Sequence, residues 1–417
     1  MFNIRERSLH LHRINQGKLG SEIKVQVRNS EELSLAYSPG VAEPCKEIYA
    51  DEDKVYEYTM KGNMVAVITN GTAVLGLGNI GPKAALPVME GKCILFKSFA
   101  GLDGFPICLD TTNVDQLVET IKILAPSFGG VNLEDIAAPH CFTIEDRLKK
   151  ELDIPVFHDD QHGTAIVTVA GLVNALKLVH KSMEHIKVVV NGAGAAGIAI
   201  VKLLLSFGVK DIIICDTKGA IFKGRSYGMN EIKNGIAVHT NRNNQEGKLH
   251  DVIKGADVFI GVSKEGVLTK EMIRSMNSDP IIFAMANPNP EIYPEEAKSA
   301  GAKIIGTGRS DFPNQVNNVL AFPGIFRGAL EVRATTINEE MKQAAVHAIA
   351  SLISEGELTE NNVIPNPFNE QVAPAVAAAV SQAAMETGVA AKWIDPEQVR
   401  EKTRQLSLIG RDLEKVL

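Results

Sequence analysis

The sequence is poor in cysteine and in aromatic residues. Its 417 residues contain five cysteines and one tryptophan, and no two cysteines form a C-x-x-C pair. An odd number of isolated cysteines argues against a disulfide framework. We therefore expect reduced thiols and a cytoplasmic protein.

Long apolar runs are also missing. The longest apolar tract, residues 373–384, is rich in alanine and is interrupted by Pro374, Ser381 and Gln382. Such a tract is too short and too interrupted to cross a bilayer. The first residues, MFNIRERSLHLHRINQGK, lack the apolar segment of a secretory signal. The net charge of −7 gives no electrostatic support for a nucleic-acid or anionic-membrane partner.

The apolar pattern predicts an α/β protein with three regions. In residues 1–160, short β-branched runs such as VAVIT and CILFKSF alternate with helical patterns such as VDQLVETIKILA. Residues 161–330 alternate near-continuous apolar strands with helices, which is typical of a doubly wound parallel sheet covered on both faces. Residues 331–417 are expected to form helices that pack back on the first region.

Two segments match the dinucleotide fingerprint G-x-G-x-x-G. GAGAAG follows the apolar run KVVV and precedes a long helical pattern, and a second strand, DIIICD, ends in Asp216. This βαβ setting predicts a dinucleotide site, with Asp216 accepting hydrogen bonds from the ribose. The residues expected to cradle the pyrophosphate are Gly192, Ala193, Gly194, Ala195, Ala196 and Gly197.

The other match, GLGNIG at residues 76–81, lacks that setting. Pro82 follows it directly and Pro87 comes five residues later, so any helix there is expected to have two turns at most. No strand ending in an acid follows at the right distance. We interpret GLGNIG as a tight turn that positions a neighbouring residue.

That neighbour is Lys92, in EGKCILFKSFAG, which we expect at the start of an apolar strand. Partial burial would lower its pKa towards the range of a general base. The alternative is an ordinary solvated lysine at the end of a strand.

Two acidic pairs follow or interrupt apolar runs. Glu134 and Asp135 lie in VNLEDIAAPHCF, and Asp159 and Asp160 lie in IPVFHDDQHGTA. At a strand-to-loop corner, carboxylates like these can converge on Mg²⁺ or Mn²⁺. The alternatives to a metal site are that these acids cap helices or lie in solvated loops.

A zinc site is the third alternative for the second acidic pair. HDDQH spaces His158 and His162 like the histidines of a metalloprotease helix. That motif needs a continuous helix and a Glu in second place. Here a strand precedes it and Gly163 follows, so we expect no zinc.

Asparagines follow two of the later strands. Asn287 lies in ANPNPEI, and Asn317 and Asn318 lie in NQVNNVLAFPG. Ligands of doubly wound sheets bind beyond the carboxyl ends of strands, so these amides could hold a cofactor or a substrate carboxylate. Each could equally be a turn residue.

Several long motifs together resemble the malic enzymes. They follow one another in that family's order and approximate spacing, from about Ser34 to Arg327, and the length is similar to the short bacterial form without a fused acyltransferase-like domain. The motifs are LAYSPGVAEP, LGLGNIGPKAALPVMEGK, NLEDIAAPHCF, FHDDQHGTA, GAGAAG, ANPNPEI and NQVNNVLAFPG.

The resemblance implies metal-dependent oxidative decarboxylation of L-malate to pyruvate and CO₂ with NAD or NADP. It assigns Lys92 as general base and Tyr37, in AYSPG, as general acid. It makes Glu134, Asp135 and Asp160 ligands of Mg²⁺ or Mn²⁺, with Asp159 beside them as a catalytic residue. Asn287 matches a cofactor-side asparagine, while Asn318, with its neighbour Asn317, matches a substrate-binding one. A homo-oligomer, a dimer, and a preference for NAD over NADP are also expected, with Lys218 softening that preference.

One departure from the family and three alternative functions accompany this assignment. Animal-type enzymes carry an arginine just before LGLG, where this sequence has Ala73. The group that neutralises the second malate carboxylate is therefore not identified. The alternatives are a malolactic enzyme, which releases lactate, a metal-dependent oxaloacetate decarboxylase, and a nucleotide-sensing protein without activity.

Overall fold

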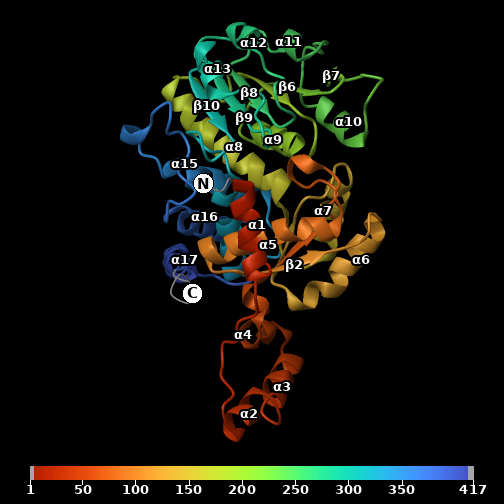
Figure 1. Cartoon of the computed structure of the whole chain (residues 1–417), viewed down its shortest axis with the longest axis vertical. Coiled ribbons are helices and arrows are strands. Elements are labelled where there is room, and N and C mark those ends of the chain that lie inside the picture. Colours follow the sequence, from red (N-terminus) through yellow and green to blue (C-terminus); the bar gives the residue numbers. More distant parts are fainter. Residues whose placement is uncertain (1–3, 412–417) are drawn as a thin grey trace.

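Two parallel β-sheets form the framework of the computed structural model, which describes residues 4–411 (Figure 1). The first sheet has four strands in the order β2 (Asp103–Cys108), β1 (Met64–Thr69), β3 (Gly130–Leu133) and β4 (Val156–His158). All of its pairings are parallel. Strands β1, β3 and β4 are buried along their whole length, including the polar Asn132 and His158 in otherwise mostly apolar sequences.

The second sheet has the topology of a dinucleotide-binding fold and confirms the predicted fold class. Its six strands have the order β10-β9-β8-β5-β6-β7, and every pairing is parallel except that of β7 with β6. Because β6 and β8 flank β5 on opposite sides, the strand order reverses at the end of β5, where ligands of such sheets bind. The strands are β5 (Lys187–Asn191), β6 (Asp211–Asp216), β7 (Gly219–Ala220), β8 (Val258–Gly261), β9 (Ile281–Ala284) and β10 (Ile304–Thr307).

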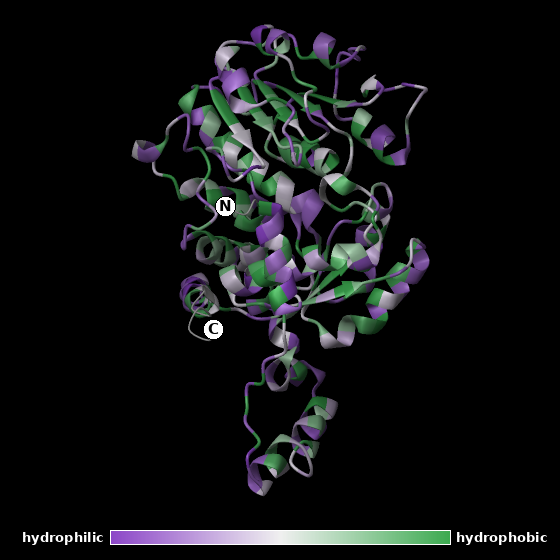
Figure 2. Ribbon diagram, in the orientation of Figure 1, coloured by the Kyte–Doolittle hydropathy of each residue, from purple (hydrophilic) through white to green (hydrophobic). Residues whose placement is uncertain are grey.

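Helices cover both sheets, and Figure 2 shows hydrophobic residues concentrated in the strands between them. The helices around the first sheet are α5 (Pro82–Ala100), α6 (Val114–Leu124) and α7 (His140–Glu151). Helix α8 (Asp159–Leu178) connects the two sheets and packs against α9 (Ala195–Ser206). Shorter helices of the second sheet are α10 (Glu231–Ala237), α11 (Leu249–Val252), α12 (Lys270–Arg274) and α13 (Pro294–Ser299).

Helix α5 corrects two predictions from the sequence. The segment around CILFKSF is part of a nineteen-residue helix instead of a strand, and Pro87 lies inside that helix. Proline at this position removes one backbone hydrogen bond. Helical spacing buries Met89, Cys93 and Phe96 in the main core, and this burial outweighs the lost bond.

The C-terminal helices pack on α5, α8 and one another. They are α14 (Phe322–Glu331), α15 (Glu339–Ser351), α16 (Val372–Glu386) and α17 (Pro396–Arg411). Phe96 of α5 meets Phe322 and Phe326 of α14 edge-on, with ring centroids 4.8 and 5.3 Å apart. This aromatic group belongs to a core cluster that also contains strand residues of both sheets.

An N-terminal arm, residues 19–59, extends away from the two sheets (Figure 1). It carries α2 (Ser30–Ala36), α3 (Ala42–Ala50) and α4 (Val55–Tyr58), and none of these helices contains a buried residue. Helix α1 (Ile4–Asn15), which precedes the arm, also contains none. Within residues 4–411, no helix is long and apolar enough to cross a membrane. The five cysteines are all free thiols.

The contact between α14 and α16 depends on Gly328. A Cβ atom added there would lie 2.5 Å from the carbonyl oxygen of Ala377. We expect Gly328→Ala to lower the free energy of unfolding by about 1–3 kcal/mol, because this overpacking outweighs the better helix propensity of alanine. Urea denaturation measures the change. Gly356→Ala, where the added Cβ meets open space, is the control, and equal stabilities of the two variants would contradict the prediction.

Candidate active site

Lys92 lies between two buried carboxylates. Its Nζ atom is 2.6 Å from Asp159 Oδ2 and 2.9 Å from Glu134 Oε1, and it lies over the ring of Phe322 at 4.3 Å. The lysine side chain is only 7% exposed. Glu134 directly follows β3 and Asp159 opens α8, so the ends of two strands and the middle of α5 meet at this point.

The pKa of Lys92 is raised, whereas the sequence analysis expected burial to lower it. Burial alone lowers the pKa of this ammonium, but Asp159 and Glu134 outweigh burial and raise it above the ordinary lysine value. Burial, together with Asp160, Asp159 and Asp135, raises the pKa of Glu134 well above its usual range against the opposing effect of Lys92. The carboxylates therefore crowd one another beyond what a single lysine compensates.

Three carboxylates of this group lie close enough to hold one cation. Oxygen atoms of Glu134, Asp135 and Asp160 are all within 4.8 Å of one another. The backbone N–H of Asp135 donates to Asp160 Oδ2 over 2.8 Å, and Asp135 has a left-handed backbone with φ of 54°. A strained backbone held by its surroundings is common at functional sites. Hard oxygen ligands and crowded negative charge fit Mg²⁺ or Mn²⁺.

The second acidic pair starts a helix, whereas the sequence indicated a strand-to-loop corner. Helix α8 begins at Asp159 and continues through Gly163, so the expected break at Gly163 was wrong, whereas His158 does lie on the preceding strand β4 and the second residue is Asp159 instead of Glu. The His162 ring nonetheless has another partner, because Nε2 lies 2.8 Å from Glu145 Oε1. His158 is fully buried, with its Nδ1 atom 3.8 Å from Asp160 Oδ2.

Glu145 is a residue that the sequence analysis missed. It lies on α7, and its carboxylate accepts hydrogen bonds from the His158 backbone N–H at 3.3 Å and from Gln161 Nε2 at 3.1 Å, besides its contact with His162. Lys149 Nζ, at 2.8 Å, completes its partners. Burial raises the pKa of Glu145, but His162 and Lys149 outweigh burial and hold it well below the usual value. Glu145 thus fixes the first turn of α8, which carries Asp159 and Asp160.

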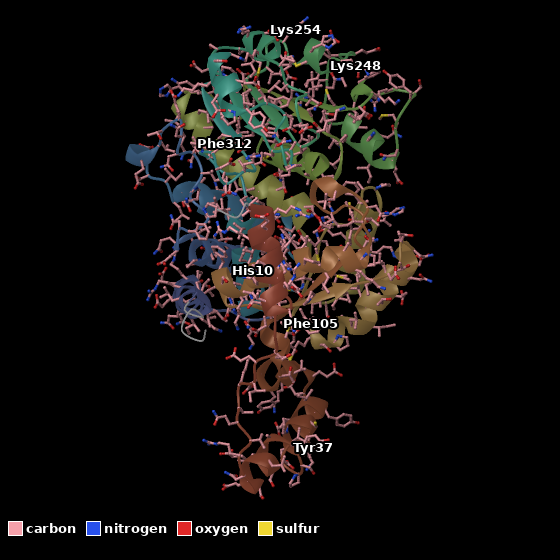
Figure 3. The ribbon with its side chains drawn as sticks, viewed as in Figure 1. His10, Tyr37, Phe105, Lys248, Lys254 and Phe312 are labelled. Atoms are coloured by element: carbon pink, nitrogen blue, oxygen red, sulfur yellow. The ribbon has the colours of Figure 1, made fainter. Side chains whose placement is uncertain are left out.

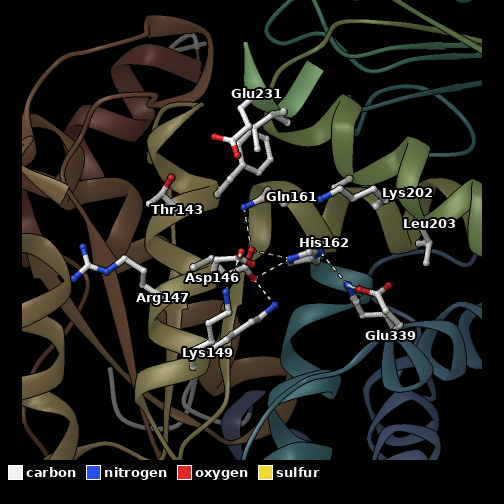
Figure 4. Close-up of a pocket in the computed structure, with 17 residues that line it drawn as sticks. Thr143, Asp146, Arg147, Lys149, Gln161, His162, Lys202, Leu203, Glu231 and Glu339 are labelled. Atoms are coloured by element: carbon white, nitrogen blue, oxygen red, sulfur yellow. Dashed lines mark hydrogen bonds and ion pairs between the residues drawn. The ribbon is translucent and has the colours of Figure 1, made fainter. Parts of the chain in front are cut away.

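The Glu145 contacts line a cavity of about 420 Å³ between α7, α8, α9 and α15 (Figure 4). Burial lowers the pKa of His162 to about 4, against the opposing effect of Glu145. A signal for Glu145 was present in the sequence. It shares one helix face with the buried Cys141, Ile144 and Leu148, and an acid on an apolar helix face needs a partner.

The two asparagines after β10 have different partners. Asn318 Nδ2 donates to Asp159 Oδ2, so Asn318 lies at the lysine–carboxylate group. Asn317 caps the short helix η5 (Asn318–Leu320), because its side-chain oxygen accepts from the Val319 N–H over 3.0 Å. Substrate binding by Asn317 stays a prediction. Asn318 joins a loop of the second sheet to an acid of the first.

The glycine turn GLGNIG makes a second connection between the sheets. A Cβ atom added at Gly76 would lie 2.5 Å from the backbone oxygen of Asn287, which follows β9. Just before this turn, the Ala73 N–H donates to the Asp135 carbonyl over 3.0 Å, which joins the turn to the loop after β3. The segment that contains GLGNIG therefore contacts both the loop after β9 and the loop that carries Asp135.

The loop GAGAAG has the geometry that a dinucleotide requires. Gly192 has φ of 125°, and a Cβ atom at Gly197 would lie 1.8 Å from the Gly192 carbonyl oxygen, so both positions need glycine. Gly194 caps α9, and a Cβ atom there would meet nothing within 4 Å. This opening at the helix N-terminus is where a pyrophosphate fits.

Asp216 ends β6 as expected, but the basic side chains that contact its carboxylate do not include Lys218. Arg225 Nη1 lies 3.0 Å and Lys233 Nζ 2.6 Å from its carboxylate. Burial raises the pKa of Asp216, but these two side chains outweigh burial and lower it to about 2. Lys218 contributes only its backbone N–H, at 2.8 Å.

Tyr37 does not lie at this site. It is 68% exposed and follows α2 on the N-terminal arm, which extends away from both sheets (Figure 3). Within one chain, the structure therefore brings together Lys92, Glu134, Asp135, Asp159, Asp160 and Asn318 but not the expected acid.

A Rossmann sheet beside a lysine–carboxylate group defines a dinucleotide-dependent oxidoreductase. The chain matches the family models for the malic enzyme N-terminal domain over residues 16–149 and the malic enzyme NAD binding domain over residues 161–385. It belongs to the malic enzyme family, as the sequence motifs predicted.

Close relatives agree with this assignment. The chain is 72% identical over 408 residues to the bifunctional malic/malolactic enzyme of Bacillus subtilis, with 98% of this chain and 100% of the relative covered. It is 56% identical to the NAD-dependent malic enzyme of Geobacillus stearothermophilus, covering 94% and 81% of the two chains. The crystal structure of malic enzyme from Pyrococcus horikoshii superimposes with a TM-score of 0.95 at 48% identity, covering 100% of this chain and 98% of that one. Other relatives are named NADP-dependent malic enzymes.

The opening at Gly194 gives a prediction for the dinucleotide site. We expect Gly194→Val to weaken NADH binding by tenfold or more, because the new side chain would fill the place of the pyrophosphate. Its backbone, with φ of −88°, accepts any residue, so thermal stability should be unchanged. NADH fluorescence titration and a melting curve measure the two quantities. Unchanged NADH affinity would show that the dinucleotide binds elsewhere.

Proposed function

We propose that this protein converts L-malate to pyruvate and CO₂ with reduction of NAD, using Mg²⁺ or Mn²⁺. The observation that carries the proposal is the contact of Lys92 with Glu134 and Asp159 beside a three-carboxylate group. The link from Asn318 to Asp159 supports it, because a residue that follows the last strand of the dinucleotide sheet touches this group.

The side chains divide the chemistry. Lys92, as the neutral amine, takes the proton of the C2 hydroxyl, and Asp159, which also accepts a hydrogen bond from Asn318, positions its nitrogen atom. Glu134, Asp135 and Asp160 would hold the divalent cation. When bound, that cation supplies positive charge beside the substrate oxygens, and the nicotinamide accepts the hydride from C2. Glu134 would then be shared between that cation and Lys92. Asn318 is the amide that we assign to a substrate carboxylate.

The assay follows NADH absorbance and identifies the product. With malate, NAD and Mn²⁺ we expect equal amounts of NADH and pyruvate, and we expect chelation to abolish both. Asp160→Asn should lower activity at least a hundredfold, because this ligand loses its charge while Asp135 and Glu134 remain. Direct Mn²⁺ titration of the variant reports the metal site independently of turnover. Full activity after chelation would contradict the metal assignment.

A malolactic reaction is the second candidate, since the relative from Bacillus subtilis is named a malic/malolactic enzyme. The same Lys92 group and dinucleotide loop would serve it, with the reduced cofactor retained and used to form lactate. Product analysis separates the two reactions. Lactate without net NADH would favour the second.

We also propose that NAD is preferred to NADP. Asp216 would accept hydrogen bonds from the ribose and face the 2′-phosphate of NADP. Arg225 and Lys233 offset part of that repulsion, so the preference should be modest.

The ratio of kcat/KM values for NAD and NADP tests the role of Asp216. Asp216→Ser should move this ratio towards NADP by tenfold or more, because it frees Lys233 and Arg225 for a phosphate. Arg225 keeps the carbonyl oxygens of Gly219 and Ala220 as acceptors, which protects the fold. Asp211→Ser, at the exposed start of the same strand, is the matched control. An NADP preference in the unmodified protein would contradict the assignment.

The active form that we propose is a homodimer. The support is the N-terminal arm, whose helices α2 and α3 are too short to be stable without packing.

A further inference from the structure

We propose that Glu291 is a positioning residue that holds Asn287, the asparagine assigned to the cofactor, in place for the dinucleotide. The inference rests on the proposed function, which makes NAD the oxidant. Asn287 itself is exposed on the loop after β9. Glu291 lies four residues later in the same ANPNPEI segment and is fully buried. An exposed binding residue on a loop needs such a buried anchor if its position is to be fixed.

The Glu291 carboxylate joins the loops that follow two neighbouring strands. Its Oε1 atom accepts from the Ser263 backbone N–H over 2.9 Å and from the Ser263 hydroxyl over 3.4 Å. Its Oε2 atom accepts from the Ala286 N–H over 3.0 Å. Ser263 follows β8 and Ala286 follows β9, so one side chain ties both loops together. Because Asn287 is the residue after Ala286, this contact fixes where Asn287 begins.

The loop after β8 also contacts the dinucleotide loop. A Cβ atom added at Gly192 would lie 2.5 Å from the Val262 carbonyl oxygen, and Val262 is the neighbour of Ser263. The Val262 N–H donates to the Asn191 carbonyl over 2.9 Å, and Asn191 Nδ2 donates to the Ser263 hydroxyl over 2.8 Å. Glu291 therefore connects the GAGAAG turn, where the pyrophosphate fits, to the loop that carries Asn287.

Two glycines show how closely these groups are packed. A Cβ atom added at Gly261, the last residue of β8, would lie 2.4 Å from Glu291 Cδ, so a larger residue there would displace the carboxylate. A Cβ atom added at Gly308, after β10, would lie 3.3 Å from Asn287 Nδ2. The carboxylate and the asparagine that it positions are thus both enclosed by loops at the carboxyl ends of parallel strands, where dinucleotides bind.

The hydrogen bonds of Glu291 need two acceptor atoms. Burial raises the pKa of Glu291, and the N–H groups of Ser263 and Ala286 oppose that effect. A glutamine of the same length has one acceptor oxygen, and its amide nitrogen only donates. In Glu291→Gln one of the two backbone N–H groups would therefore lose its acceptor, so one loop would be released while the buried volume stays the same.

NADH fluorescence titration of Glu291→Gln tests the inference. We expect the Kd for NADH and the KM for NAD to rise tenfold or more. The KM for malate and the Kd for Mn²⁺ should stay within twofold, because the carboxylate group lies at the first sheet. A general loss of structure would weaken all four quantities. Glu295→Gln, with the same charge change at the exposed start of α13, is the matched control and should leave NADH affinity unchanged.

A double variant shows whether Glu291 acts through Asn287. If it does, Asn287→Ala combined with Glu291→Gln should bind NADH no more weakly than Asn287→Ala alone, since the asparagine to be positioned is already gone. Losses that multiply would overturn the inference. An NADH affinity within twofold of the unmodified protein, in either single variant, would also overturn it.

Melting curves of all variants check that the fold survives. If Glu291→Gln fails to fold, Glu291→Asp takes its place, because the shorter carboxylate keeps its charge but does not reach both N–H groups. The same selective loss of NADH affinity is expected. The titration needs no turnover, so an unmodified protein that binds NADH but does not oxidise malate would contradict the proposed function alone. Unchanged NADH affinity in a variant of a protein that does oxidise malate would contradict the role of Glu291 alone.

Discussion

The buried ion pairs of Lys92 are the interaction on which the rest of the site depends. A charged side chain that is 7% exposed is stable only with close partners, and here Glu134 and Asp159 provide them. Each partner comes from a different element, so satisfying one ammonium fixes α5 against the end of β3 and the start of α8. Removing one partner of a buried pair commonly costs about 3–5 kcal/mol, so the geometry of the site and the stability of the fold are coupled.

Shared polar contacts and one close backbone approach also join the two sheets. Asp159 meets Lys92 on one side and Asn318 on the other, and Gly76 allows the turn before α5 to touch the loop after β9. Glu145 completes the arrangement from α7 by holding the first turn of α8. A substrate bound at the carboxylates would therefore have its position relative to the dinucleotide loop set by packed backbone and buried polar contacts.

The sequence predicted the second sheet better than it predicted the group around Lys92. The strand DIIICD is recognised from its continuous apolar residues, and the dinucleotide loop is recognised from the glycines of GAGAAG. Both signals lie within one short segment of sequence. The wrong prediction for α5 came from reading Pro87 as a helix end, although the burial of Met89, Cys93 and Phe96 decides the segment. The direction of the Lys92 pKa could not be predicted, because it depends on carboxylates more than forty residues away in sequence. Glu145 was missed although it lies on an apolar helix face, since three of its four partners lie outside its own helix.

Tyr37 shows a different limit of sequence analysis. A motif identifies the residue type that a reaction needs but not where the fold places that residue. Lys92 and its carboxylates are held by the core of one chain, whereas Tyr37 lies on a segment with no core of its own. Packing of the arm in the homodimer that we propose would stabilise these short helices, which explains why an exposed and apolar segment can be retained.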